Sequence, residues 1–257
     1  MLDISYLNKL RRFEIEQILP FLPGGCRVLD FGSGTGEQAR LLAKHGFHVI
    51  AIDLAGSNYA ANRVFPVLDY DGRKIPLDDQ SVDLIFSSNV LEHVEDLEQI
   101  AQEFRRILKP DGFAVHVLPT AVWRSWSFVT ALTESLRAAL NLPAELIHAG
   151  PMERRQHVLV RELRHIASGF IPRAHGTSAE GVSELWTFSS PAWRRKFERC
   201  GFEVVHERPC GIFYTGTLFF GERFSIAKRR SLSRLFGSVT RAYFVKPKPR
   251  TRSANSR

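Results

Sequence analysis

Apolar and polar positions alternate regularly along the first 120 residues. Five short apolar runs are typical of buried strands: residues 26–31, 47–52, 64–68, 82–87 and 113–118. Amphipathic segments that predict helices precede or separate these runs, at residues 4–19, 37–45 and 96–108. Because strands that alternate with helices of this length pair side by side, the pattern predicts a parallel sheet with right-handed crossovers.

The alternation stops after Thr120 and returns near the C-terminal end. Residues 121–168 have a helical pattern, which we expect Pro143 and Pro151 to interrupt. A further helix and two strands follow, at residues 191–200, 202–208 and 212–220. We predict an α/β fold, a Rossmann-like, doubly wound, seven-stranded and mostly parallel sheet. It has an antiparallel edge strand and a helical cap inserted at about 121–188.

The positive charge of the chain is concentrated at its C-terminal end. The net charge is +8, and from Arg223 onward there are eleven Lys/Arg and no Asp/Glu. Residues 1–222 are therefore slightly acidic. A nucleic-acid-binding domain places its basic residues along the binding face, so we expect no nucleic-acid partner.

Cysteine usage and hydropathy suggest where the protein works. The three cysteines have no paired spacing, which favours a reducing compartment over a disulfide framework. The N-terminus lacks the apolar run of a signal peptide, and no uninterrupted apolar stretch reaches about 18 residues. We therefore expect a cytoplasmic protein without a transmembrane helix.

A glycine-rich turn follows the first predicted strand, with the sequence Asp30-Phe31-Gly32-Ser33-Gly34-Thr35-Gly36. Glycines at a strand-to-helix turn let the backbone approach a ligand closely, although a tight turn without a ligand has the same composition. A dinucleotide site would need its third glycine at position 37, where Glu37 would repel a pyrophosphate. S-adenosylmethionine (SAM) carries a sulfonium cation and no phosphate, so Asp30 and Glu37 favour SAM over NAD.

A second acidic position, Asp53, ends the second predicted strand. In nucleotide-binding folds an acid at this place accepts hydrogen bonds from ribose hydroxyls. The alternative is an exposed turn residue without a ligand. The preceding glycine turn favours the ribose interpretation.

Four segments in this order resemble class I SAM-dependent methyltransferases of the small-molecule type: residues 29–36 with Asp53, 71–85, 87–94 and 104–112. The third contains the Leu91-Glu92-His93-Val94 run of that class, and the fourth ends in Lys109-Pro110-Asp111-Gly112. Together they extend over roughly residues 26–120. The resemblance implies a methyltransferase domain at residues 1–222, with SAM as cofactor.

The resemblance also implies which residues bind SAM. The glycines of the turn would lie along its methionine and ribose portions, and Asp53 would bind the ribose. Asp71 would lie near the adenine amino group, and Asn89 beside the methionine moiety. The complete predicted cofactor-binding set is Asp30, Gly32, Ser33, Gly34, Gly36, Asp53, Leu54, Asp71, Gly72 and Asn89.

His93 is a candidate catalytic residue with a structural alternative. In metal-assisted quinone O-methyltransferases of this class, the glutamate and histidine of the Leu-Glu-His run help to hold a divalent ion, with another glutamate three residues before the first. That earlier position is Asn89 here. We therefore expect no metal, and we expect Glu92 and His93 to line the donor pocket.

The acceptor side should be built from the cap. An oxygen acceptor benefits from a general base, and His148, His157 and His175 are candidates, with His175 preferred because small residues and two acids surround it. Residues 175–197 are similar to methyltransferases encoded among bacterial surface-polysaccharide genes. That similarity implies O-methylation of a glycan, a lipid-linked glycan or another small molecule. Alternatives are a quinone or metabolite methyltransferase, an RNA methyltransferase, a non-catalytic SAM-binding module and an NAD-dependent oxidoreductase.

The basic segment 223–257 has a helical pattern of its own. One face collects apolar residues and basic residues accompany them, namely Leu232, Leu235, Phe236, Val239 and Tyr243 with Lys228, Arg229, Arg230, Arg234 and Arg241. Such a helix either binds an anionic membrane surface, which would make the protein peripheral at the inner membrane, or docks on the body by the same face. We expect residues 246–257 to be disordered.

Overall fold

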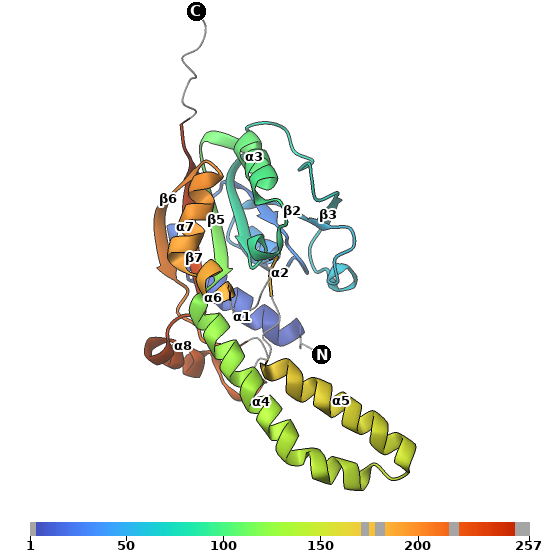
Figure 1. The fold of residues 1–257 in the computed structure, drawn as a ribbon. Coiled ribbons are helices and arrows are strands. Elements are labelled where there is room, and N and C mark those ends of the chain that lie inside the picture. Colours follow the sequence, from blue (N-terminus) through green and yellow to red (C-terminus); the bar gives the residue numbers. More distant parts are fainter. Residues whose placement is uncertain (1–3, 171–174, 178–182, 216–220, 250–257) are drawn as a thin grey trace, which may run out of the picture. The chain divides into compact units, whose positions relative to one another are not determined.

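A computed structural model describes residues 4–170, 175–177, 183–215 and 221–249 (Figure 1). The chain divides into two compact units. The sheet unit comprises Asp3–Leu118, Ser190–Cys210 and Arg241–Arg257. The helical unit comprises Pro119–Ser189 and Gly211–Thr240, with Met1–Leu2.

Seven strands form one sheet in the order β3-β2-β1-β4-β5-β7-β6. The strands are β1 (Arg27–Phe31), β2 (His48–Leu54), β3 (Val67–Tyr70), β4 (Val82–Ser88), β5 (Leu108–Pro119), β6 (Phe202–Pro209) and β7 (Thr240–Pro247). The neighbours from β3 to β5 are parallel, and the edge strand β6 pairs antiparallel with β7. The predicted seven-stranded, mostly parallel sheet with an antiparallel edge is therefore confirmed.

The position of the last strand differs from the prediction. Residues 211–215 form no strand, residues 216–220 lie outside the described residues, and β7 forms at Thr240–Pro247 instead. The helix α8 (Ile226–Phe236) ends at Gly237, which has a φ of 91° that favours glycine. The prediction that the helix continues through Val239 and Tyr243 is thus wrong. The run from Val239 to Val245 is rich in β-branched and aromatic residues and is largely buried, as expected for a strand.

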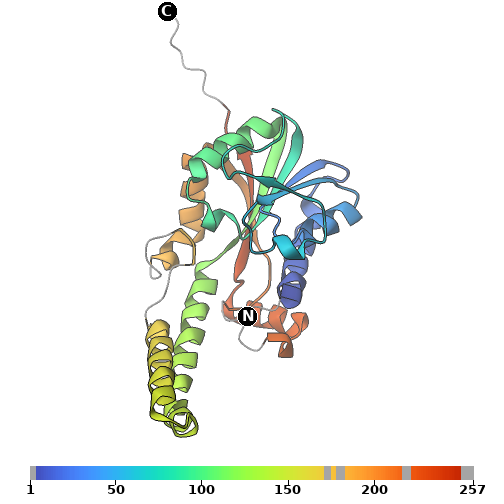
Figure 2. The ribbon, with the colours of Figure 1, turned by 90° about the vertical axis from the view of Figure 1, so that its right-hand side faces the viewer.

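Helices cover both faces of the sheet (Figure 2). α1 (Ile4–Glu16) and α2 (Glu37–Lys44) lie on one face, and α3 (Leu97–Ile107) and α7 (Ser190–Arg199) lie on the other. Apolar residues of α1, α2 and the strands form the first core layer, including Ile15, Leu42, Leu84, Phe86 and Val117. In the second layer the ring of His116 stacks between Phe104 and Phe197, at 5.6 Å from each. This two-layer covering is the doubly wound arrangement.

The helical unit contains a long antiparallel hairpin of α4 (Ala121–His148) and α5 (Met152–Phe170), visible in Figures 1 and 2. The prediction that Pro143 interrupts the helix is wrong, because Pro143 lies inside α4. A proline removes one backbone hydrogen bond, and the flanking turns of a long helix can sustain that loss. No helix within the described ranges has the length and apolar content needed to cross a bilayer.

α8 also belongs to the helical unit, where an aromatic cluster holds its apolar side. The ring of Phe236 lies 4.7 Å from that of Trp126 and 5.5 Å from that of Phe213. Arg229 is buried and donates hydrogen bonds to the carbonyl oxygens of Phe213 and Gly221, at 3.1 and 2.8 Å. Phe236 of the apolar face predicted for a membrane surface therefore packs within the helical unit, whereas Leu235 of that face is 74% exposed.

Candidate functional site

The glycine turn joins β1 to α2 with three left-handed residues. The φ angles are 70° at Gly32, 56° at Gly34 and 75° at Gly36, a region that other residues rarely adopt. The N–H groups of Gly32 and Ser33 both donate to the carbonyl oxygen of Ile52, at 2.9 and 3.0 Å. The turn is thereby fixed to β2, and its backbone lies at the carboxyl ends of the central strands.

Each glycine of the turn is also a point of close packing. A Cβ on Gly32 would lie 2.6 Å from both γ-carbons of Val90, and one on Gly34 would lie 3.4 Å from the ring of Tyr59. A Cβ on Gly36 would lie 2.8 Å from the Cβ of Phe65. Side chains at Gly32 and Gly36 are thus excluded on steric grounds as well as by backbone conformation, and a side chain at Gly34 is disfavoured by backbone conformation alone.

Two hollows open at this end of the sheet, and Gly32 lines both. The first has a volume of about 110 Å³ and is lined by polar groups that include Asn8, Arg11, Ser33 and Asn89. The Oγ of Ser33 is buried and has no hydrogen-bond partner among the described residues. A buried hydroxyl without a partner is a polar group that a ligand would satisfy.

The second hollow, of about 390 Å³, lies over the ends of β2 and β3. It is lined by Asp53, Leu54, Asp71 and Gly72, four residues of the predicted cofactor set. Oδ1 of Asp71 accepts hydrogen bonds from the N–H groups of the two residues after Gly72, at 2.8 and 2.9 Å, and these bonds lower the pKa of Asp71. The hollow therefore presents two carboxyl groups at adjacent strand ends, where ligands bind in open α/β sheets.

Asp30 lies buried beneath the turn. Burial and, to a smaller extent, the charge of Asp53 raise the pKa of Asp30 to about 7, against the lowering effect of a hydrogen bond from the N–H group of Ala39. Oδ2 of Asp30 has no hydrogen-bond partner among the described residues. Asp30 is thus buried at the end of β1, while Asp53 lines the second hollow.

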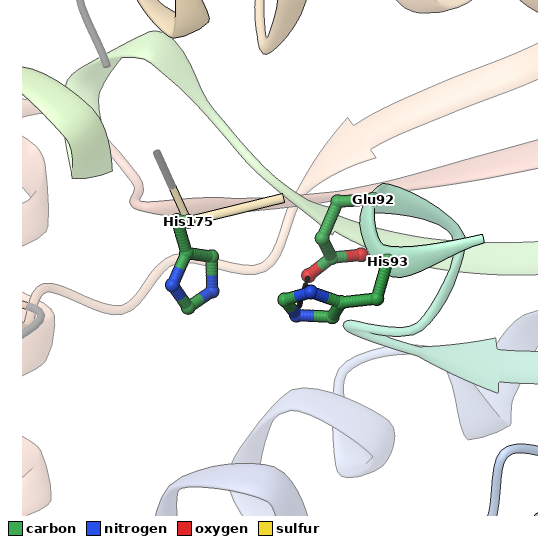
Figure 3. Close-up of side chains that lie close together, drawn as sticks. All are labelled: Glu92, His93 and His175. Atoms are coloured by element: carbon green, nitrogen blue, oxygen red, sulfur yellow. Dashed lines mark ion pairs between the residues drawn. The ribbon is translucent and has the colours of Figure 1, made fainter. Parts of the chain in front are cut away.

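Asn89, Glu92 and His93 follow β4. Asn89 has a φ of 54°, which is uncommon for a non-glycine residue and often marks a functional position. Figure 3 shows the carboxylate of Glu92 beside the ring of His93, with Oε1 and Nε2 3.9 Å apart. Glu92 is buried and burial raises its pKa to about 8, whereas His93 is exposed and lines the second hollow.

His175 lies in the helical unit, where a buried ion pair holds its backbone. The N–H groups of His175 and Gly176 donate to Oε1 of Glu184, at 2.6 and 2.9 Å. Oε2 of Glu184 lies 3.0 Å from Nε of Arg124, and both charged groups are buried. The ring of His175 lies 4.5 Å from that of Trp123. The role predicted for His175 stays a prediction.

The hollows bring together most of the predicted cofactor set and add residues that the sequence did not indicate. Asp30 and Gly36 line neither hollow, and their predicted role in cofactor binding stays a prediction. Asn8 and Arg11 come from α1, which precedes the recognisable motifs. The only sequence signal for them was a polar face on an otherwise apolar helix.

Comparison with known families identifies the class of the site. Residues 29–116 match the family model of a methyltransferase domain. The matched segment begins in β1 and ends in β5. It therefore contains the glycine turn, Asp53, and the ends of β2 and β3 that line the second hollow. The resemblance to class I SAM-dependent methyltransferases is therefore confirmed for this segment.

Individual relatives match over part of their length. The chain is 38% identical over 113 residues to the biotin biosynthesis bifunctional protein BioHC of Cellvibrio japonicus, covering 41% of this chain and 22% of that protein. It is 30% identical to the malonyl-[acyl-carrier protein] O-methyltransferase of Pectobacterium atrosepticum, covering 59% and 63%. The chain thus spans between about a fifth and two thirds of these two relatives.

A solved structure shows the same fold over nearly the whole chain. The S-adenosylmethionine dependent methyltransferase from Mesorhizobium loti aligns with a TM-score of 0.53 and 18% identity. The alignment covers 91% of this chain and 97% of that one. The Rossmann-like methyltransferase fold is therefore confirmed.

Proposed function

We propose that this protein is a SAM-dependent methyltransferase that binds its donor across the two hollows that meet at Gly32. The proposal rests on the observation that Gly32 lines both hollows. A polar hollow and a larger hollow that is lined by Asp53 and Asp71 at adjacent strand ends share one glycine, at the place where nucleotides bind in such sheets.

The residues present suit such a donor. Asp53 and Asp71 offer carboxylate oxygens to ribose hydroxyls and to an adenine amino group, both of which are hydrogen-bond donors. On the other side of Gly32, Asn89, Arg11 and the unpartnered Ser33 hydroxyl suit the amino and carboxylate groups of a methionine moiety. When bound, SAM supplies a methyl group already activated as a sulfonium. The chain's own residues then have to position the acceptor in line with it.

The charge pattern supports SAM over NAD. Glu37 opens α2 at the place where a dinucleotide fingerprint has its third glycine. Its carboxylate is held by Arg40 at 2.7 Å and lines the first hollow. A pyrophosphate beside this carboxylate would be repelled, whereas a sulfonium or an ammonium group would be attracted.

The acceptor we propose is an oxygen of a small or carrier-linked molecule. One relative acts as a malonyl-[acyl-carrier protein] O-methyltransferase, and another is named as a demethylmenaquinone methyltransferase of Corynebacterium urealyticum. The similarity of residues 175–197 to polysaccharide-cluster methyltransferases favours a glycan or lipid-linked glycan hydroxyl. We keep His175 as the candidate general base and His93 as a second candidate.

Transfer of a labelled methyl group tests the proposal. The full chain is incubated with methyl-labelled SAM and, separately, with a malonyl thioester, a demethylated quinone, lipid-linked glycans and RNA. We expect label to enter one of the small acceptors and RNA to stay unlabelled. His175→Gln should then lower kcat at neutral pH while leaving SAM affinity unchanged. SAM binding without transfer to any acceptor in a complete cell extract would favour the non-catalytic module instead.

A further inference from the structure

One face of the α4–α5 hairpin is apolar and exposed. Val129, Leu136, Leu140 and Ile147 follow one another along α4 at spacings of seven, four and seven residues. At 100° per residue these positions fall within an arc of about 40°. Leu140 is 82% exposed and Ile147 is 72% exposed, so the described residues leave this part of the stripe uncovered.

The second helix carries a matching stripe. Met152, Val160 and Leu163 lie within about 80° on α5 and are all exposed, Met152 by 71%. The α4 stripe is rotated by about 100° from the side of α4 with half-buried Leu132, Leu142 and Leu146. The α5 stripe is rotated by about 100°, in the same sense along the chain, from the side with half-buried Val158 and Leu159.

Because α4 and α5 are antiparallel (Figure 1), equal senses of rotation bring the two stripes to the same side of the pair. We call this surface the hairpin face and define it by Val129, Leu136, Leu140, Ile147, Met152, Val160 and Leu163. A continuous apolar surface of this kind marks an interaction site.

Either a second copy of the hairpin or an anionic lipid surface could cover the hairpin face. The charges around the face distinguish between these two possibilities. Among the hairpin side chains that the structure describes, three exposed arginines border the hairpin face at about 80–100° from the centre of the stripe on their own helix, namely Arg137, Arg155 and Arg164. The exposed acid Glu145 lies about 160° from the α4 stripe, and the exposed Arg154 and Arg161 lie on the opposite side of α5. A second copy of the hairpin would bring like charges together, which disfavours pairing. An anionic lipid surface would attract the arginines, whose long side chains reach headgroups while neighbouring apolar residues enter the interface.

We propose that the hairpin face binds the surface of an anionic membrane. Within the hairpin face, the strongly exposed Ile147 and Met152 flank the turn between the helices, Leu140 lies two helical turns earlier on α4, and Arg155 lies one turn after Met152. No described helix can cross a bilayer, so the contact is peripheral. This places the membrane contact on α4 and α5 rather than on α8, where Phe236 packs against Trp126 and Phe213. The inference does not depend on methyl transfer.

Vesicle co-sedimentation of the full chain tests the proposal. The test variant is Leu140→Glu with Ile147→Glu. The matched control is Asn141→Glu with His148→Glu, which adds the same charges at the same spacing but rotated by about 100° away from the hairpin face. A third variant, Leu235→Glu, changes the exposed apolar residue of α8. Circular dichroism confirms that each variant folds.

We expect the wild type to bind phosphatidylcholine vesicles that contain about one third phosphatidylglycerol, and to be released as salt rises toward about 1 M. The test variant should bind at least about tenfold more weakly, and both other variants should stay within about twofold of the wild type. The proposal is overturned if the wild type does not bind or if the test variant binds equally well. Loss of binding only in Leu235→Glu would assign the contact to α8. A dimer in light scattering that the test variant dissociates would assign the face to a second copy.

Discussion

Gly32 and Val90 approach each other so closely that a Cβ on the glycine would lie 2.6 Å from both γ-carbons of the valine. The glycine also has a φ of 70°. Gly32→Ala therefore has to displace the turn after β1 or the residues after β4, both of which border the two hollows. We expect it to lower the free energy of unfolding by about 2–4 kcal/mol and SAM affinity by at least about tenfold. Denaturant unfolding and calorimetry measure the two effects.

Gly24→Ala is the matched control for this substitution. A Cβ at Gly24 would meet no heavy atom within 4 Å, and its φ lies outside the left-handed region. We expect stability and SAM affinity to be unchanged. Equal behaviour of the two alanine variants would mean that the turn tolerates a side chain and is not a close-packed cradle.

Removing the carboxylate of Asp53 should weaken SAM binding without unfolding the protein. Asp53→Ala deletes an acceptor for ribose hydroxyls, and hydrogen bonds to charged groups contribute about 1.5–3 kcal/mol, or roughly tenfold to a hundredfold in Kd. Asp69 pairs in register with Asp53 on the neighbouring strand but forms an exposed ion pair with Arg63. Asp69→Ala should therefore leave the Kd unchanged. If both variants bind SAM like the wild type, the ribose assignment is wrong.

Burial of Glu92 should make stability fall as pH rises. Its folded-state pKa is about 8 against an ordinary value of 4.5, because burial disfavours the charged form. Between these values the folded protein holds a proton that the unfolded chain has lost. The free energy of unfolding therefore decreases with increasing pH across this window.

Glu92→Gln should remove this dependence. Between pH 5 and pH 8 the free energy of unfolding should fall in the wild type but not in the variant. The difference between the two proteins should therefore change in favour of the variant, by an amount on the order of a few kcal/mol. Urea unfolding at several pH values measures it, and Glu98→Gln, at an exposed position of α3, serves as control. Parallel curves for wild type and Glu92→Gln would show that Glu92 is ionised in the folded protein.

The buried pair of Arg124 and Glu184 should stabilise the helical unit. Glu184→Ala leaves the guanidinium of Arg124 buried without its carboxylate and removes the acceptor for the N–H groups of His175 and Gly176. Breaking a buried ion pair from one side costs about 3–5 kcal/mol. We expect rapid proteolysis near His175 in this variant, mapped by mass spectrometry, while Glu145→Ala on the exposed part of α4 behaves like the wild type.

The sheet was predictable because periodicity and turn residues agree along residues 26–118. The last strand was not. Leu232, Leu235, Phe236, Val239 and Tyr243 satisfy a helical spacing, but Gly237 ends the helix after Phe236. Local spacing alone does not show that the run after Gly237 is inserted between β5 and β6, since that pairing depends on residues far apart in the sequence.

The candidate site was predictable where motif and strand end coincide, as at Gly32, Asp53 and Asn89. Arg11 and Asn8 could not be found in this way, because they reach the first hollow through the packing of α1 on α2. The exposed hairpin face could not be predicted from the sequence for a related reason. Its apolar spacing is typical of a buried helix side, and only the observed exposure of Leu140 and Ile147 distinguishes it.

Calorimetric titration of the full chain with SAM, its demethylated product and NAD shows whether the two hollows that meet at Gly32 hold SAM. We expect one site for SAM and for the demethylated product, a weaker affinity for both in Asp53→Ala, and no heat with NAD. If NAD binds, or if SAM does not bind to the folded wild type, the two hollows are not a SAM site.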